Sequence, residues 1–152
     1  MFCKNRRQQI SHDALNSNTT GGNNTALGNE ALRSNTTASG NTAVGYQAGV
    51  NLTTGGSNTF FGNSAGKGKT TGAYNTIIGN SAGANSGSTK QGQTIVGASA
   101  GQYNNGDNNS VLGFGALQYG SASNSVAVGN QAIHNGGGGN DVAVGKSAGR
   151  NS

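Results

Sequence analysis

Few residues in this sequence have types and spacing that could do chemistry, and the most suggestive run is GNSAGKGKT at 62–70. Glycine amides followed by a lysine and a hydroxyl residue cradle phosphates in nucleotide-binding loops. The spacing does not fit, because a loop ending in Gly68, Lys69 and Thr70 requires glycine at position 63, where the chain has Asn63. We therefore expect no phosphate-binding loop.

Metal ligands are equally sparse. The run GGGGNDVAV at 136–144 matches a calcium-binding nonapeptide once, but that site needs aspartates from successive repeats. A zinc site would have to combine Cys3 with His12 and His134, which are too few and too far apart. We expect no metal and no cofactor.

Catalytic groups do not form a constellation. Acid–base catalysis needs paired carboxylates or a histidine with an orienting partner, but the four acidic residues and two histidines are scattered over different coils. This pattern predicts that the protein is not an enzyme.

Composition points away from an ordinary globular domain. Glycine contributes 29 of 152 residues, and there is no proline or tryptophan. Leu, Ile, Val and Phe together number 23, which is few for a conventional core. Only 9% of residues are charged, with a net charge of +5, whereas disordered chains usually carry high charge.

The distribution of charged, aromatic and apolar residues indicates which classes of partner to expect. The short basic cluster of Lys4, Arg6 and Arg7 is typical of a solvated chain end, and the other cations are scattered singly. No aromatic platform accompanies them, so we expect no nucleic-acid binding. The chain has no apolar run long enough for a membrane span or a signal peptide.

An internal repeat decides the architecture. Eight segments share one frame of two apolar residues, a glycine, two variable residues and an alanine, at steps of 16 to 18 residues. The structural repeat glycines are Gly28, Gly45, Gly62, Gly79, Gly97, Gly113, Gly129 and Gly145. The alanines, expected to line the interior of each coil, are Ala31, Ala48, Ala65, Ala82, Ala100, Ala116, Ala132 and Ala148.

A degenerate ninth repeat precedes them, with Ser11 in place of the glycine and Ala14 in the alanine frame. We expect residues 1–22 to form an N-terminal segment and capping coil, and residues 23–152 to form a repeat domain of eight coils.

Repeats of 16 to 18 residues are too short for helix pairs, so the fold class is predicted as all-β, a parallel β-solenoid or β-roll. Each coil should hold one strand around the apolar pair and a second near the alanine, with turns at TTGGS, NSGS, YNNGDN and HNGGGG. Nine coils about 4.8 Å apart would give a rod roughly 43 Å long.

Both faces of the predicted strand are apolar, although only one can fill the coil. We therefore expect a homo-oligomer that covers the second face, with ladders of Asn and Thr such as Thr25 and Thr42 adding support. The core and oligomer face is predicted to comprise Leu27, Val44, Phe60, Phe61, Ile77, Ile78, Ile95, Val96, Val111, Leu112, Val128 and Val144.

Two aromatic residues follow the repeat glycine, where most other coils carry asparagine. Tyr46 and Phe114 are candidate surface ligand contacts, because an aromatic ring can stack on a sugar and repeated weak sites gain avidity. Local packing is the alternative, and it applies equally to Tyr74, Tyr103 and Tyr119.

The runs NSVAVG at 124–129, NDVAVG at 140–145 and NTAVGYQAG at 41–49 resemble the repeats of trimeric autotransporter adhesin heads. They are also similar to the NTAVGYQA arrays of bacteriophage tail-fibre-like proteins. The resemblance covers roughly residues 23–151 and implies a left-handed parallel β-roll, a homotrimer, and a role as a rigid shaft or host-contacting surface. The coils are longer than typical autotransporter repeats, and no exported N-terminus, stalk or membrane barrel is visible, which favours the phage type.

The expected function is therefore a structural fibre or adhesin-like module, of the phage tail-fibre type, located in a virion or on an extracellular surface. It would give a rigid trimeric rod that attaches multivalently to a host glycan or receptor. The alternative is a self-assembling extracellular filament whose coils stack end to end. An ice-binding solenoid is a third class, which would require a flat array of Thr-x-Thr.

Overall fold

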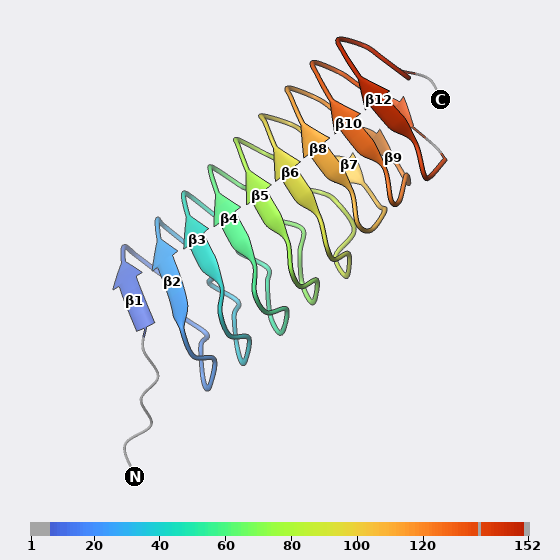
Figure 1. The fold of residues 1–152 in the computed structure, drawn as a ribbon. Coiled ribbons are helices and arrows are strands. Elements are labelled where there is room, and N and C mark those ends of the chain that lie inside the picture. Colours follow the sequence, from blue (N-terminus) through green and yellow to red (C-terminus); the bar gives the residue numbers. More distant parts are fainter. Residues whose placement is uncertain (1–6, 137, 151–152) are drawn as a thin grey trace.

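The computed structural model describes residues 7–136 and 138–150, with the backbone alone for residues 7–10. Within that part the chain is all-β, without helices, and winds as a parallel β-solenoid (Figure 1). Cys3, Lys4 and Arg6 lie outside the described residues. One turn of the solenoid is called a coil below.

A sheet of nine parallel strands, the main sheet, runs the length of the solenoid. Its strands follow one another in sequence order, so each coil pairs with the coil before and after it. They are β1 (Arg7–Ile10), β2 (Asn24–Leu27), β3 (Thr42–Val44), β4 (Thr59–Phe61), β5 (Thr76–Ile78), β6 (Thr94–Val96), β8 (Ser110–Leu112), β10 (Val126–Val128) and β12 (Val142–Val144).

In the main sheet, residues at equivalent positions of successive repeats pair with each other. Ala43 pairs with Phe60, and Phe60 pairs with Ile77, each one repeat along the chain. Strand β1, from the degenerate repeat, pairs in the same frame, because Ile10 lies opposite Leu27. The varying step of 16 to 18 residues is absorbed in the turns, and the strands stay aligned.

The core is a single column inside the coils. In strands β2 to β12 the residue two positions before the repeat glycine points inward, so that Phe60, Ile77 and Ile95 are fully buried. Below them lie the repeat alanines, of which Ala31 to Ala132 are fully buried and Ala148 is partly buried. Small alanines opposite one larger residue per strand fit the thin interior of such a coil.

The predicted second strand near the alanine does not form there. Ala31 lies between Glu30 (φ 59°) and Leu32 (φ 50°), and this alternation of left-handed residues cannot continue a strand. A second sheet, of three strands, begins three residues after the alanine in the later coils only. Its strands are β7 (Tyr103–Asn104), β9 (Tyr119–Gly120) and β11 (Asn135–Gly136).

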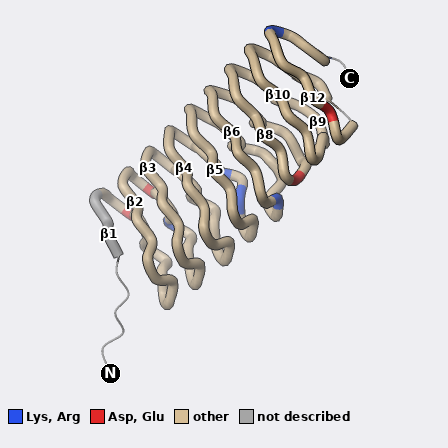
Figure 2. The backbone as a smooth tube through the Cα atoms, viewed as in Figure 1, with Lys and Arg blue, Asp and Glu red and all other residues tan. Residues whose placement is uncertain are grey.

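Charged residues are few and dispersed over the described coils (Figure 2). Among the described residues, Arg33 pairs with Glu30 and Lys90 pairs with Asp107, and His12 Nδ1 lies 2.8 Å from Asp13 Oδ2. The scarcity of charge means that backbone hydrogen bonds and side-chain amides must join the coils, as described next.

Candidate functional site

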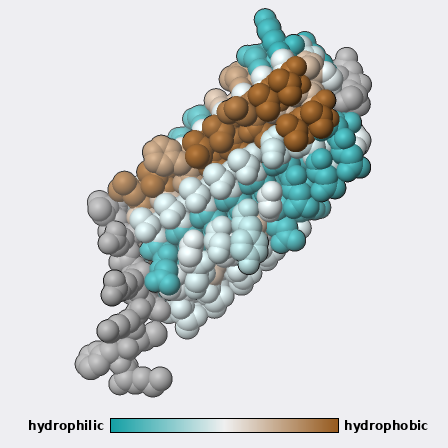
Figure 3. All heavy atoms as spheres, in the orientation of Figure 1, coloured by the Kyte–Doolittle hydropathy of each residue, from teal (hydrophilic) through white to brown (hydrophobic). Residues whose placement is uncertain are grey.

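The outer face of the main sheet carries a continuous row of large apolar side chains, called the outward row (Figure 3). It arises because residues that flank the buried middle residue of a strand point away from the core. Its members are Leu27, Val44, Phe61, Ile78, Val96, Leu112, Val128 and Val144.

The outward row is the most apolar exposed feature of the described chain. Leu27 is 43% exposed, Phe61 54%, Leu112 52% and Val144 69%. The other four members are half-buried. Among the described residues no segment packs over this face. A contiguous exposed apolar surface of this kind usually marks an interaction site.

A second row runs parallel to it on the same face, two residues earlier in each strand. Thr25, Thr42, Thr59 and Thr76 pair in register from coil to coil, followed by Thr94 and Ser110. In the last two strands Val126 and Val142 replace the hydroxyl residues. The outer face therefore combines a hydroxyl row with an apolar row, and becomes wholly apolar toward β12.

The aromatic residues proposed as ligand contacts are exposed but far apart. Tyr46 is 49% exposed and Phe114 is 56% exposed, each after the repeat glycine that ends its strand. Their strands, β3 and β8, are four steps apart in the main sheet, which is about 19 Å at 4.8 Å per step. The structure does not bring them into one site within a single chain.

The repeat glycines hold the coils at contact distance. Gly28 has φ +131°, and a Cβ built on it would lie 2.5 Å from the carbonyl oxygen of Gly45. The same approach recurs at the repeat glycines up to Gly129, each meeting the next glycine along the stack. Glycine is required there for both its backbone conformation and its lack of a side chain.

The interior holds a ladder of side-chain amides, at positions that the repeat frame alone does not single out. At Asn58, Oδ1 accepts a hydrogen bond from the Asn75 backbone N–H (3.0 Å), and Nδ2 donates to Gly72 O (3.0 Å). Each asparagine of the ladder thus satisfies a backbone N–H in the next coil and a carbonyl in a turn, whereas Gln93 donates to Gly106 O (2.6 Å) and its Oε1 accepts from Lys69 Nζ. The members of this interior amide ladder are Asn24, Asn41, Asn58, Asn75, Gln93 and Asn109.

Lys69, from the rejected phosphate-loop run, is fully buried inside the solenoid. Its Nζ donates to Gln93 Oε1 (2.7 Å), Gly87 O (3.2 Å) and Lys90 O (3.3 Å). Burial lowers the pKa of Lys69 from 10.5 to about 7, against the opposing charge of Asp107 and with the help of Lys90. The position one repeat earlier is Leu52, also fully buried, so alignment of the coils could have indicated an interior lysine.

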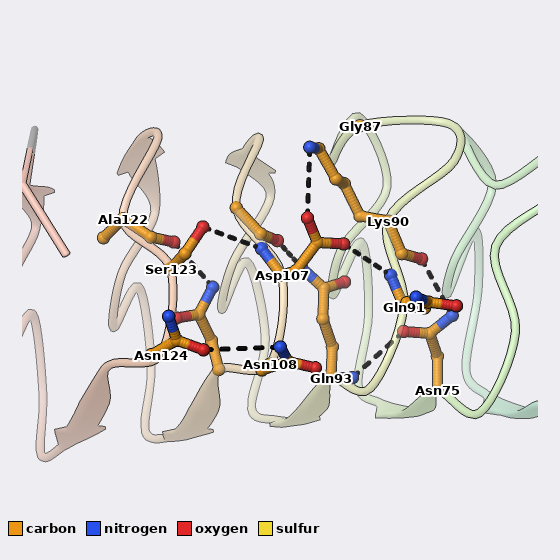
Figure 4. A network of polar contacts seen from close by, with 12 residues as sticks. Asn75, Gly87, Lys90, Gln91, Gln93, Asp107, Asn108, Ala122, Ser123 and Asn124 are labelled. Atoms are coloured by element: carbon orange, nitrogen blue, oxygen red, sulfur yellow. Dashed lines mark hydrogen bonds and ion pairs between the residues drawn. The ribbon is translucent and has the colours of Figure 1, made fainter. Parts of the chain in front are cut away.

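A polar network lies beside Lys69 in the following turns (Figure 4). Asp107 accepts hydrogen bonds from Lys90 Nζ (3.2 Å) and from the Gln91 backbone N–H (2.9 Å). Partial burial would raise the pKa of Asp107, but these two hydrogen bonds and the lysine charges outweigh it and hold the pKa below its ordinary value. Asp107 is therefore a carboxylate at neutral pH.

The second sheet carries an exposed aromatic ladder. The rings of Tyr103 and Tyr119 stack with centroids 5.2 Å apart and an interplanar angle of 4°, and His134 meets Tyr119 edge-on. Gln118 lies alongside and bonds both His134 Nε2 (3.0 Å) and Gln102 Oε1 (3.1 Å). The stacking covers one face of each tyrosine ring, and both side chains stay partly exposed, Tyr103 at 41% and Tyr119 at 43%.

The described residues contain no pocket and no cluster of three or more His, Cys, Asp or Glu that could hold a metal ion. They also contain no helix long and apolar enough to cross a membrane.

Comparisons of the chain with protein-family models, with curated proteins and with solved structures find no match.

Proposed function

We propose that this chain is a non-catalytic rod module of a fibre or adhesin-like assembly, whose copies associate through the outward row. The observation that carries the proposal is the exposure of this apolar row along the whole main sheet, where Phe61 and Leu112 are each more than half exposed. A partner that is equally long and regular would remove the most apolar area of this sheet from water.

A second copy of the chain meets that requirement. In copies that lie parallel and in register, each coil presents its outward residue at the same height, so the rows align over the eight strands from β2 to β12. Burial at roughly 25 cal/mol per Å² of apolar surface would then supplement the small core of each chain. The resemblance implies a left-handed parallel β-roll built as a homotrimer.

Multivalent attachment follows from the same arrangement. Tyr46 and Phe114 are exposed, and one copy of each per chain would recur around the rod. Weak sites for a sugar ring or a receptor surface would gain avidity from that repetition. The proposed location is a virion tail fibre or another extracellular surface.

Particle mass and shape test the proposal directly. We expect light scattering on the purified chain to give a discrete mass of three chains, and negative-stain images of the same sample to show short rods of constant length. Phe61→Glu places a charge in the outward row and should shift the mass to one chain, with the fold retained by circular dichroism.

Thr54→Glu is the matched control, because Thr54 is exposed in the turn of the preceding coil and lies off the main sheet. It should leave the mass unchanged. A wild-type mass of one chain, or the same mass for wild type and Phe61→Glu, would refute association through the outward row. Open-ended filaments in the images would instead support the filament alternative.

A further inference from the structure

The sequence contains two Asn–Gly pairs, Asn105–Gly106 and Asn135–Gly136. An asparagine followed by glycine is prone to lose its side-chain amide, because a following residue without a Cβ leaves its backbone nitrogen open to attack the asparagine side chain. The dipeptide is the same at both places, so the fold decides which pair reacts.

The backbone N–H of Gly106 has no hydrogen-bond acceptor among the described residues. Two equivalent glycines of earlier coils, each three residues before an asparagine of the interior amide ladder, do have one. Gly21 N–H bonds Thr36 O (3.4 Å), and Gly72 N–H bonds Ser88 O (3.3 Å). The nitrogen of Gly106 can therefore lose its proton without breaking a native hydrogen bond.

The side chain of Asn105 is exposed in the turn that follows β7. Its amide takes no part in the side-chain hydrogen bonds of this turn, which join Gln93 Nε2 to Gly106 O (2.6 Å) and Asp107 N–H to Ser123 Oγ (3.1 Å). Water thus reaches the amide of Asn105, and no hydrogen bond to the described residues holds it away from the Gly106 nitrogen.

The second pair is held in place. Asn135–Gly136 forms strand β11, where Asn135 N–H bonds Arg150 O (3.0 Å) and Gly136 N–H bonds Ile133 O (3.3 Å). The Asn135 side chain is also engaged, with Oδ1 lying 3.1 Å from His134 Nδ1. A reaction at this pair would first have to break these contacts.

We propose that Asn105 is a site of spontaneous deamidation in the folded chain and that the fold protects Asn135. The Gly106 nitrogen gives its proton to water or hydroxide and attacks Cγ of Asn105. The N–Cγ bond forms, the Cγ–Nδ2 bond breaks, and Nδ2 takes a proton from water and leaves as ammonia. A second water opens the cyclic imide at either carbonyl, which gives aspartate or isoaspartate; overall, one water is consumed and one ammonia released.

Either product places a new carboxylate next to the polar network of these turns (Figure 4). Asp107 lies two residues away and already holds Lys90 Nζ at 3.2 Å. The isoaspartate also adds a carbon atom to the main chain where Gly106 approaches Ala122 O too closely for a Cβ to fit. We therefore expect deamidation to alter this one turn as the protein ages and to leave the main sheet paired.

Incubation of the native full chain at about pH 8 and about 37 °C, followed by peptide mapping with mass spectrometry, tests the proposal. Deamidation adds about 1 Da to the peptide in which it occurs. The peptide with Asn105 should gain this mass at least about tenfold faster than the peptide with Asn135. Chromatography should separate its product into aspartate and isoaspartate forms.

The denatured chain and two variants are the controls. In about 6 M guanidinium chloride the two pairs should react at rates within about threefold of each other, because neither is then protected. Asn105→Gln should abolish the early mass gain of the native chain, since glutamine would have to close a larger ring. Asn135→Gln should leave that gain unchanged.

Equal rates at the two pairs in the native chain, or a faster reaction at Asn135, would overturn the proposal. So would a preference for Asn105 that persists in denaturant, because the fold would then not be its cause. Neither asparagine belongs to the outward row, and peptide masses do not depend on the number of chains in the particle. Deamidation and the proposed association can therefore fail independently.

Discussion

Gly62 and Gly79 stand one above the other in adjacent coils, so close that a Cβ on Gly62 would lie 2.6 Å from the carbonyl oxygen of Gly79. At φ +134°, Gly62 also holds a conformation that other residues rarely adopt. Close stacking of the coils and a positive φ thus both require glycine at this position of the repeat.

Gly62→Ala should lower the free energy of unfolding by about 3–5 kcal/mol, because it adds a steric clash to backbone strain. Gly145 separates the two causes: it has φ +124°, but its Cβ would meet nothing closer than Ala148 Cβ at 4.0 Å. Gly145→Ala should cost only about 1–3 kcal/mol. Chemical denaturation measures both, and equal losses would contradict the stacking argument.

The interior amide ladder predicts a large effect from one buried side chain. Asn58→Ala removes the acceptor of the Asn75 backbone N–H and the donor to Gly72 O, and leaves both groups buried without that partner. The free energy of unfolding should fall by about 2–4 kcal/mol. Asn63 is exposed in the same coil, and Asn63→Ala should stay within about 0.5 kcal/mol of wild type.

Stability should depend on pH through Lys69. Its pKa is lowered in the folded chain to about 7, so the unfolded chain binds the extra proton between pH 7 and 10.5. The free energy of unfolding therefore rises with pH in this window, by at most about 1.4 kcal/mol per unit. Denaturant titrations at pH 7, 8 and 9 should show this rise as the difference between wild type and Lys69→Leu; parallel curves would exclude it.

Association through the outward row should resist salt. The row contains no charged side chain among its eight members, so screening has little to weaken. Particle mass by light scattering should be the same in about 0.05 M and about 1 M NaCl. A mass that falls as salt increases would indicate that charged residues elsewhere hold the copies together.

The strands could be predicted from sequence because their signal is strictly periodic. Two apolar residues before each repeat glycine indicate a strand with two apolar faces, and the register follows from the spacing of those glycines. The pattern leaves open which residue fills the coil; the structure buries Ala43 and leaves Val44 half-buried on the outer face. The alanine segment was harder. Glu30 and Leu32 flank Ala31 with positive φ, and neither residue type signals that conformation.

The interior polar groups escaped prediction for a different reason. Lys69 lies in a run that looks like a phosphate loop, and only the stacking of coils places it over the core column that contains Leu52. Its acceptors come from a turn about 20 residues later, whose extra residue has no local sequence signature. The exposure of Tyr46 could be anticipated, but its separation from Phe114 depends on the number of coils between them.

Because the coils stack in register, the number of coils can change without altering the structure of the individual coil. Each coil bonds only to its two neighbours, so inserting or deleting one complete repeat alters a single junction and leaves every other pairing intact. Such a change would move the two ends by about 4.8 Å without altering the cross-section. Duplication of the coding sequence for one 17-residue repeat would therefore lengthen the solenoid by one coil and leave the rest of the fold unchanged.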